Sequence, residues 1–205
     1  MSTPEVPAVL KSIAPICLCV SLTVGLSAQT AGGQAAPPPT PPASTSAEVL
    51  GMYTNITNFI GRTAAMVPVE KLTWQPTPEV RSFARLFAHI VDDNNGACSA
   101  IAGVTPPATR MDTGNDKDGW AANKMAKADL EKALADSVAV CSKAFAAVNQ
   151  TNMMEMQGRR TKMGALIYNT SHINEHYGNL VTYLRLNNMV PPSSAPRGGG
   201  PGENR

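Results

Sequence analysis

Residues 172–176 read HINEH, and this stretch lies inside a long run whose apolar residues recur at helical spacing. Two histidines four positions apart lie on one face of an α-helix, about 6 Å apart along its axis. His172 and His176 can therefore reach the same metal ion. The chain has three histidines in all, and the third, His89, lies in another strongly helical stretch. The sequence predicts that all three converge on one divalent metal between packed helices.

Four stretches with helical periodicity surround these histidines. They span about residues 44–67, from 77 or 82 to about 102, 120–148 and 161–187. Ala, Leu and Met dominate this part of the chain, and runs of β-branched residues are few. About seventeen residues separate the second stretch from the third, more than a turn between antiparallel neighbours needs. The predicted fold is therefore all-α, a four-helix bundle with a long crossover, or a lid, between helices 2 and 3.

Both ends of the chain have compositions unlike the middle. In residues 1–28, Lys11 precedes an uncharged apolar run, and the small residues Ser27 and Ala28 follow it. This order is typical of a signal peptide. Residues 29–44 form a Pro-rich linker, residues 45–192 the bundle, and residues 193–205 a Pro/Gly/Ser-rich tail expected to be disordered. The expected location is periplasmic or secreted. An uncleaved membrane anchor is the alternative to a cleaved signal.

Removal of such a signal leaves two cysteines, Cys98 and Cys141. An exported protein can keep a disulfide bond between them. Because both cysteines lie in Ala-rich helical stretches, two buried thiols are the alternative. The sequence leaves both outcomes open.

Three neutral imidazoles bind zinc or a neighbouring first-row ion and leave a position for water or a thiolate. Zinc in such a site lowers the pKa of its water to about 7. Asp93 shares a helical face with His89, and Glu175 precedes His176, so both carboxylates are candidate catalytic proton acceptors. The alternatives are solvated carboxylates and a core histidine that bonds a carbonyl group. Imidazole ligands alone do not name the metal.

Several function classes are disfavoured by the same sequence. A net charge of +2, 5% aromatic residues and no basic run argue against a nucleic-acid partner. Residues 172–176 also spell H-x-x-E-H, an inverted zinc-protease pattern that needs an acidic ligand farther along the chain. Only Glu203, in the Gly/Pro-rich tail, follows Glu175. The chain has no Gly-rich phosphate loop followed by a helix.

The segments WQPT (74–77), RSFARLFAHI (81–90), HINEHYGNL (172–180), YLR (183–185) and VPP (190–192) resemble the DinB/YfiT-like metalloproteins. The resemblance covers about residues 47–192. It implies a four-helix bundle whose metal ligands are His89, His172 and His176. The metal in such proteins is usually nickel or zinc, and homodimers are common. Some members are transferases or isomerases that use low-molecular-weight thiols.

These observations predict an exported metal-binding protein with a three-histidine site. In the first hypothesis the site activates water or a thiol, which makes the protein a metal-dependent hydrolase or thiol transferase acting on an unknown small molecule. The alternative is a bundle that binds a metal or a small ligand without turnover, or that has a structural role.

Overall fold

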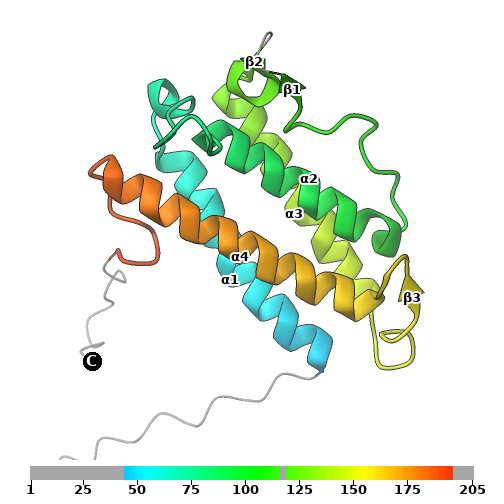
Figure 1. Ribbon diagram of the computed structural model, residues 1–205. Coiled ribbons are helices and arrows are strands. Elements are labelled where there is room, and N and C mark those ends of the chain that lie inside the picture. Colours follow the sequence, from blue (N-terminus) through cyan, green and yellow to red (C-terminus); the bar gives the residue numbers. More distant parts are fainter. Residues whose placement is uncertain (1–43, 116–118, 196–205) are drawn as a thin grey trace, which may run out of the picture. The chain divides into compact units, whose positions relative to one another are not determined.

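The computed structural model describes residues 44–115 and 119–195. Four long helices form a bundle (Figure 1): α1 (Thr45–Met66), α2 (Phe83–Ala102), α3 (Lys127–Ala147) and α4 (Lys162–Leu186). The predicted all-α four-helix bundle is thereby confirmed. The expected signal peptide (1–28), almost all of the linker and residues 196–205 of the expected tail lie outside the described residues.

Side-chain caps determine where three of the helices begin. The hydroxyl groups of Ser44, Ser82 and Thr161 accept hydrogen bonds from the backbone N–H groups three residues later. Helix α2 ends at Gly103, whose φ of 66° is the left-handed conformation that glycine adopts without strain. Asn188, with φ 58°, takes the same role after α4, as the Asn pair at this end of the helix predicts.

Helices α1 and α2 pack mainly against α3 and α4 rather than against each other. Asn94 of α2 bonds Ser137 of α3, and Cys98 bonds Cys141, so α2 and α3 run parallel. Helix α4 runs antiparallel to α2, because its Asn169 donates a hydrogen bond to Asn94, whereas its Tyr183 packs on Phe83. A connection between parallel neighbours must return along the length of the bundle, which Figure 1 shows for the segment after α2.

This return segment is more structured than the sequence predicts. It contains the short strands β1 (Gly114–Asn115) and β2 (Gly119–Trp120), which pair antiparallel, and a 3₁₀ turn, η2 (Ala121–Lys124). The prediction that the third helix begins near residue 120 was therefore wrong, because α3 begins at Lys127. Ala126 has extended backbone angles and breaks the helical run. Composition does not reveal this break, because Ala and Lys occur on both sides of it.

Three polar side chains connect α2, α3 and α4 inside the apolar core. Asn169 donates from Nδ2 to Oδ1 of Asn94 at 2.9 Å, and Asn94 donates to the hydroxyl of Ser137 at 3.1 Å. Ser137 in turn donates to the carbonyl oxygen of Leu134. All three side chains are buried. A shift of any one helix would leave a buried amide unpaired, so this chain of hydrogen bonds fixes the register of the three helices.

Side chains in the C-terminal half of α4 form hydrogen bonds with the first residues of the expected tail. The backbone N–H of Ser193 donates to the Tyr177 hydroxyl at 3.1 Å, and Arg185 donates to the Ser194 hydroxyl. Residues 193–195, the first of the expected tail, are thus among the described residues and contact α4. None of the helices in the described ranges is long and apolar enough to span a bilayer.

A disulfide bond joins Cys98 and Cys141, whose Cα atoms lie 4.9 Å apart. Of the two outcomes that the sequence leaves open, the structure has the bonded one. The bond lies one helical turn beyond the buried Asn94–Ser137 pair and connects the same two parallel helices.

Breaking this bond should lower the free energy of unfolding. The chain-entropy model gives about 4 kcal/mol for a loop of this length. Urea unfolding of the mature protein with and without reductant measures the difference. The Cys98→Ala/Cys141→Ala double variant is the control, and reductant should leave its unfolding midpoint unchanged. Two free thiols in the non-reduced mature protein, detected by mass spectrometry, would contradict the bond.

Candidate metal centre

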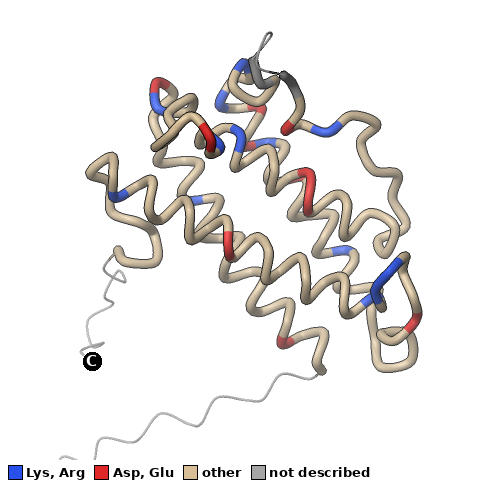
Figure 2. The backbone as a smooth tube through the Cα atoms, viewed as in Figure 1, with Lys and Arg blue, Asp and Glu red and all other residues tan. Residues whose placement is uncertain are grey.

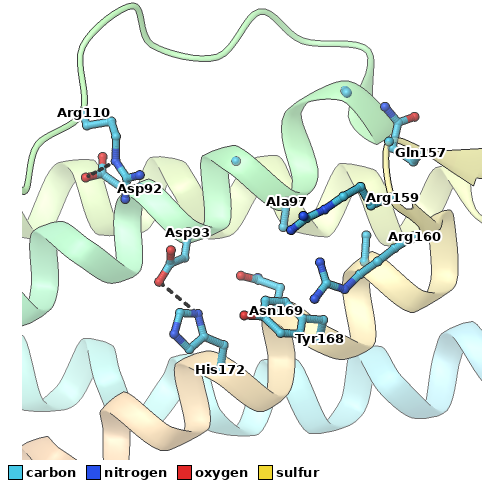
Figure 3. A pocket seen from close by; sticks show the side chains of 14 residues that line it. Asp92, Asp93, Ala97, Arg110, Gln157, Arg159, Arg160, Tyr168, Asn169 and His172 are labelled. Atoms are coloured by element: carbon cyan, nitrogen blue, oxygen red, sulfur yellow. Dashed lines mark hydrogen bonds and ion pairs between the residues drawn. The ribbon is translucent and has the colours of Figure 1, made fainter.

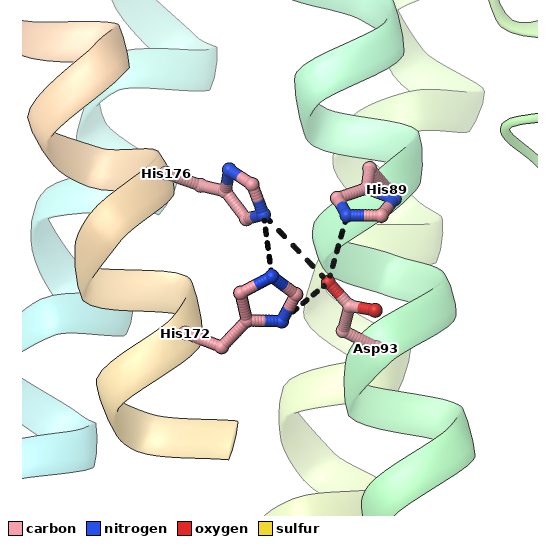
Figure 4. A group of neighbouring side chains, drawn as sticks. All are labelled: His89, Asp93, His172 and His176. Carbon is pink, nitrogen blue, oxygen red and sulfur yellow. Dashed lines mark hydrogen bonds and ion pairs between the residues drawn. The ribbon is translucent and has the colours of Figure 1, made fainter. Parts of the chain in front are cut away.

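Two antiparallel helices each present one pair of side chains four positions apart. Helix α2 carries His89 and Asp93, and α4 carries His172 and His176 (Figure 4). One ligand atom from each of these four residues lies within 4.8 Å of the other three. The structure therefore brings together the three histidines that the sequence singled out. It also places Asp93 among the possible metal ligands.

Two of the separations between these atoms match those around a small cation, and the others are at most 4.8 Å. Nε2 of His172 lies 3.1 Å from Nε2 of His176, and Nε2 of His89 lies 3.3 Å from Oδ2 of Asp93. Ligand atoms about 2.1 Å from one ion, at tetrahedral or octahedral angles, are about 3.0–3.4 Å apart. The same Asp93 oxygen lies 3.3 Å from Nδ1 of His172 and 4.0 Å from Nε2 of His176.

The hydrogen bonding of the cluster is incomplete. Oδ2 of Asp93 is buried and has no hydrogen-bond partner among the described residues, although imidazole nitrogens surround it. Two neutral imidazoles whose Nε2 atoms face each other at 3.1 Å need a proton or a cation between their lone pairs. A divalent cation would neutralise the carboxylate and use these lone pairs together. The donor set of three nitrogens and one oxygen thus fits such an ion.

Burial keeps two of the histidines uncharged. It lowers the pKa of His89 to about 4, and the positive charge of Arg81 acts in the same direction. Burial likewise lowers the pKa of His176 to about 4, assisted by the neighbouring His172 and by Arg81. Burial also raises the pKa of Asp93, which His172 partly opposes. Neutral imidazoles are the form that binds a metal, so at neutral pH no proton has to leave His89 or His176.

Asp112, in the segment between α2 and β1, is a site residue that the sequence did not reveal. Its side chain accepts hydrogen bonds from Nε of Arg81 at 2.8 Å and from Nε of Arg85 at 3.0 Å. Its Oδ2 also lies 3.7 Å behind Nδ1 of His89. At this distance Asp112 does not bond the ring, whose Nδ1 has no hydrogen-bond partner among the described residues, but its negative charge raises the pKa of His89 and offsets part of the effect of burial.

The position of Asp112 depends on Asp92. The side chain of Asp92 accepts hydrogen bonds from the backbone N–H groups of Met111 and Asp112, at 2.8 and 2.9 Å. Asp92 thus fastens the return segment to α2 rather than remaining a solvated charge. The sequence contains one sign of this network, a run of four polar residues at intervals of four: Arg81, Arg85, His89 and Asp93. The acidic partner in the loop has no comparable spacing.

Glu175, the second candidate proton acceptor, is exposed on α4 and is not in the cluster. Its carboxylate is near enough to act electrostatically on His176, but it is not one of the converging ligand atoms. Asp93 is the carboxylate that the fold places at the histidines.

Comparison with known proteins identifies a family. A family model described as the DinB superfamily matches residues 53–180, a range that contains all four residues of the cluster and Asp112. No curated protein matches the chain. A solved structure titled "Crystal structure of the conserved protein of locus from Enterococcus faecalis" is similar, with a TM-score of 0.58 and 18% sequence identity. The match covers 70% of this chain and 96% of that one, and at this identity it supports the fold alone.

The lowered pKa values predict how the stability of the metal-free protein depends on pH. In the unfolded chain both histidines titrate near 6.5, whereas in the folded protein His89 and His176 titrate at about 4. Between these values the unfolded state binds more protons than the folded state. The contribution of the two histidines to the free energy of unfolding is therefore fully present above about pH 6.5 and is lost as the pH falls toward about 4. The raised pKa of Asp93 offsets part of this loss at the acidic end.

Urea unfolding midpoints of the metal-free protein between pH 7.5 and 4 test this dependence. The His89→Gln/His176→Gln variant is the control, and its midpoint should fall less steeply over the same range. Equal slopes for the two proteins would show that these histidines are not held neutral in the fold.

Proposed function

Since the chain belongs to the DinB superfamily, we propose that it is an exported, metal-dependent enzyme that acts on a small molecule by hydrolysis or thiol transfer. The four side chains His89, Asp93, His172 and His176 would hold one divalent ion. One observation carries the proposal: these side chains converge from two helices around a buried carboxylate oxygen of Asp93 that has no hydrogen-bond partner among the described residues. Leaving such groups buried without a partner is costly, and a cation removes that cost.

Zinc or nickel is the proposed metal. Imidazole nitrogen suits both ions, and a single carboxylate oxygen completes a set of four ligands without a thiolate. The bound ion would supply Lewis acidity, which lowers the pKa of a water or thiol that reaches the site.

The protein's own residues prepare the site in three ways. Burial keeps His89 and His176 neutral. Asp112, held by two arginines, lies 3.7 Å from Nδ1 of His89 and places a negative charge there. Asp93 would bind the ion through Oδ2, which faces the centre of the cluster, and its second carboxylate oxygen is the proposed proton acceptor.

Export is proposed on two grounds. The N-terminal 28 residues have the composition of a signal peptide. Independently, the Cys98–Cys141 bond is a feature that persists in oxidising compartments and is rare in the reducing cytosol of mesophiles.

Metal content tests the proposed site. Mature protein purified without chelators should contain about one equivalent of a divalent metal, measured by elemental analysis. His89→Ala and Asp93→Asn should each lower the affinity by at least about 100-fold, more than is typical for residues that only support a ligand. Glu175→Gln, which removes a neighbouring exposed carboxylate, is the matched control and should keep its metal. Unchanged metal content in His89→Ala would remove the site.

Turnover tests the enzymatic part of the proposal. Metal-loaded protein is screened with ester, amide and thiol-transfer substrates, before and after dialysis against a chelator. The expected result is activity that disappears with the metal and returns on reloading. Activity that survives metal removal would contradict a metal-centred mechanism. A full metal site without turnover in any class would instead favour a binding protein.

A further inference from the structure

A pocket of about 420 Å³ opens beside the metal cluster (Figure 3). Asp93 and His172 form one end of it. The walls are α2, α4 and the hairpin of β3 (Met156–Gln157) and β4 (Arg160–Thr161), which precedes α4. A pocket of this volume is in the range that encloses a small molecule.

The hairpin is built to hold two arginines at the opposite end of this pocket. Gln157 pairs with Arg160, so Gly158 and Arg159 form a two-residue turn, and Gly158 has the φ of 64° that such turns require. The hairpin runs directly into α4, whose cap is formed by the Thr161 hydroxyl. A Cβ at Gly164 would lie 2.9 Å from that hydroxyl oxygen, so this tight junction needs glycine.

Two backbone hydrogen bonds further limit the freedom of the hairpin. The N–H of Lys162 donates to the carbonyl of Glu155 at 2.8 Å, and the N–H of Met163 donates to that of Met153 at 3.1 Å. The Lys162 ammonium also lies 2.6 Å from a carboxylate oxygen of Glu155. The arginines thus project from a fixed segment. Figure 3 shows both side chains extending along the pocket toward the end with Asp93 and His172.

Arg159 and Arg160 differ from Lys162, which pairs with Glu155. Two carboxylates line the pocket: Asp92 pairs with Arg110 and accepts from two backbone N–H groups, and Asp93 faces the histidines through Oδ2. Within the described residues, no carboxylate pairs with Arg159 or Arg160. Figure 2 shows these adjacent basic residues at the hairpin, next to the start of α4.

An aromatic ring connects the arginines to the metal cluster. The guanidinium carbon of Arg160 lies 3.7 Å above the centre of the Tyr168 ring. The Tyr168 ring centre in turn lies 5.6 Å from that of His172. Stacking on an aromatic face leaves the N–H edge of the guanidinium available to an anion. Arg160, Tyr168 and His172 thus follow one another in a continuous row along the pocket.

We infer that the pocket binds a small anionic substrate, whose acidic group Arg159 and Arg160 hold while its other end faces Asp93 and His172. The assignment of that other end as the reacting one rests on the function proposed above. The planar guanidinium of an arginine donates two parallel hydrogen bonds to a carboxylate or to a phosphate. Neutral esters or amides of the same length would lose this contact.

A pair of probes that differ only in charge tests the inference. The probes are 3-mercaptopropionate and its neutral amide, and calorimetric titration measures the affinity of each for the full-length mature protein. Both carry the same thiol, so the affinity ratio of acid to amide reports the acidic group alone. We expect a ratio of about tenfold, because exposed arginines give less than the full value of a charge-assisted hydrogen bond.

Three variants separate this contact from general charge effects. In Arg159→Ala/Arg160→Ala the ratio should fall to about one. Arg62→Ala/Lys143→Ala removes the same charge from exposed positions outside the pocket and should keep the ratio. Arg159→Lys/Arg160→Lys keeps the charge but not the planar fork, and its ratio should lie in between.

The results also distinguish the failure of this inference from failure of the proposed function. A ratio near one in metal-loaded wild-type protein, or a ratio unchanged in the arginine-to-alanine variant, would overturn the anion subsite while the metal site stands. If the protein holds no metal, both probes bind more weakly. A ratio that still depends on Arg159 and Arg160 then supports the subsite on its own.

Discussion

The central constraint in this bundle is the antiparallel packing of α2 against α4, which sets two pairs of side chains face to face. Each pair is spaced by four residues, so each projects from one side of its helix. Burial then acts on three of these side chains: it keeps the imidazoles of His89 and His176 neutral and leaves a carboxylate oxygen of Asp93 without a donor. The result is a preformed set of ligand atoms, which needs little rearrangement to take up a cation.

The rest of the structure holds α2 and α4 in that register. The buried amides of Asn94 and Asn169 connect them one turn from the cluster, and Ser137 extends the connection to α3. The disulfide bond joins α2 to α3 a further turn along. On the other side of the site, the return segment places Asp112 behind His89. Buried polar contacts of this kind add specificity as well as stability, because each alternative register leaves a group unpaired.

The sequence was sufficient for the fold class and for the meeting of the three histidines, because both follow from helical periodicity and from the scarcity of histidine. The i,i+4 relation also pointed to Asp93, although as a candidate proton acceptor rather than a member of the ligand group. The start of α3 was missed, since Ala126 differs from a helical residue only in its backbone angles. Asp112 and the arginines of the hairpin were missed because loop residues reach a site through tertiary contacts, which leave no periodic pattern in the sequence.

X-ray absorption spectroscopy of the metal-loaded protein tests the central claim most directly, since it reports the atoms bound to the ion. The four proposed ligands should give a first shell of nitrogen and oxygen at about 2.0–2.2 Å, with the multiple scattering of three imidazole rings. That signal should fall to two rings in His172→Ala. A shell that contains sulfur, or fewer than three imidazoles in the wild-type protein, would show that the metal is bound elsewhere and that α2 and α4 do not form its site.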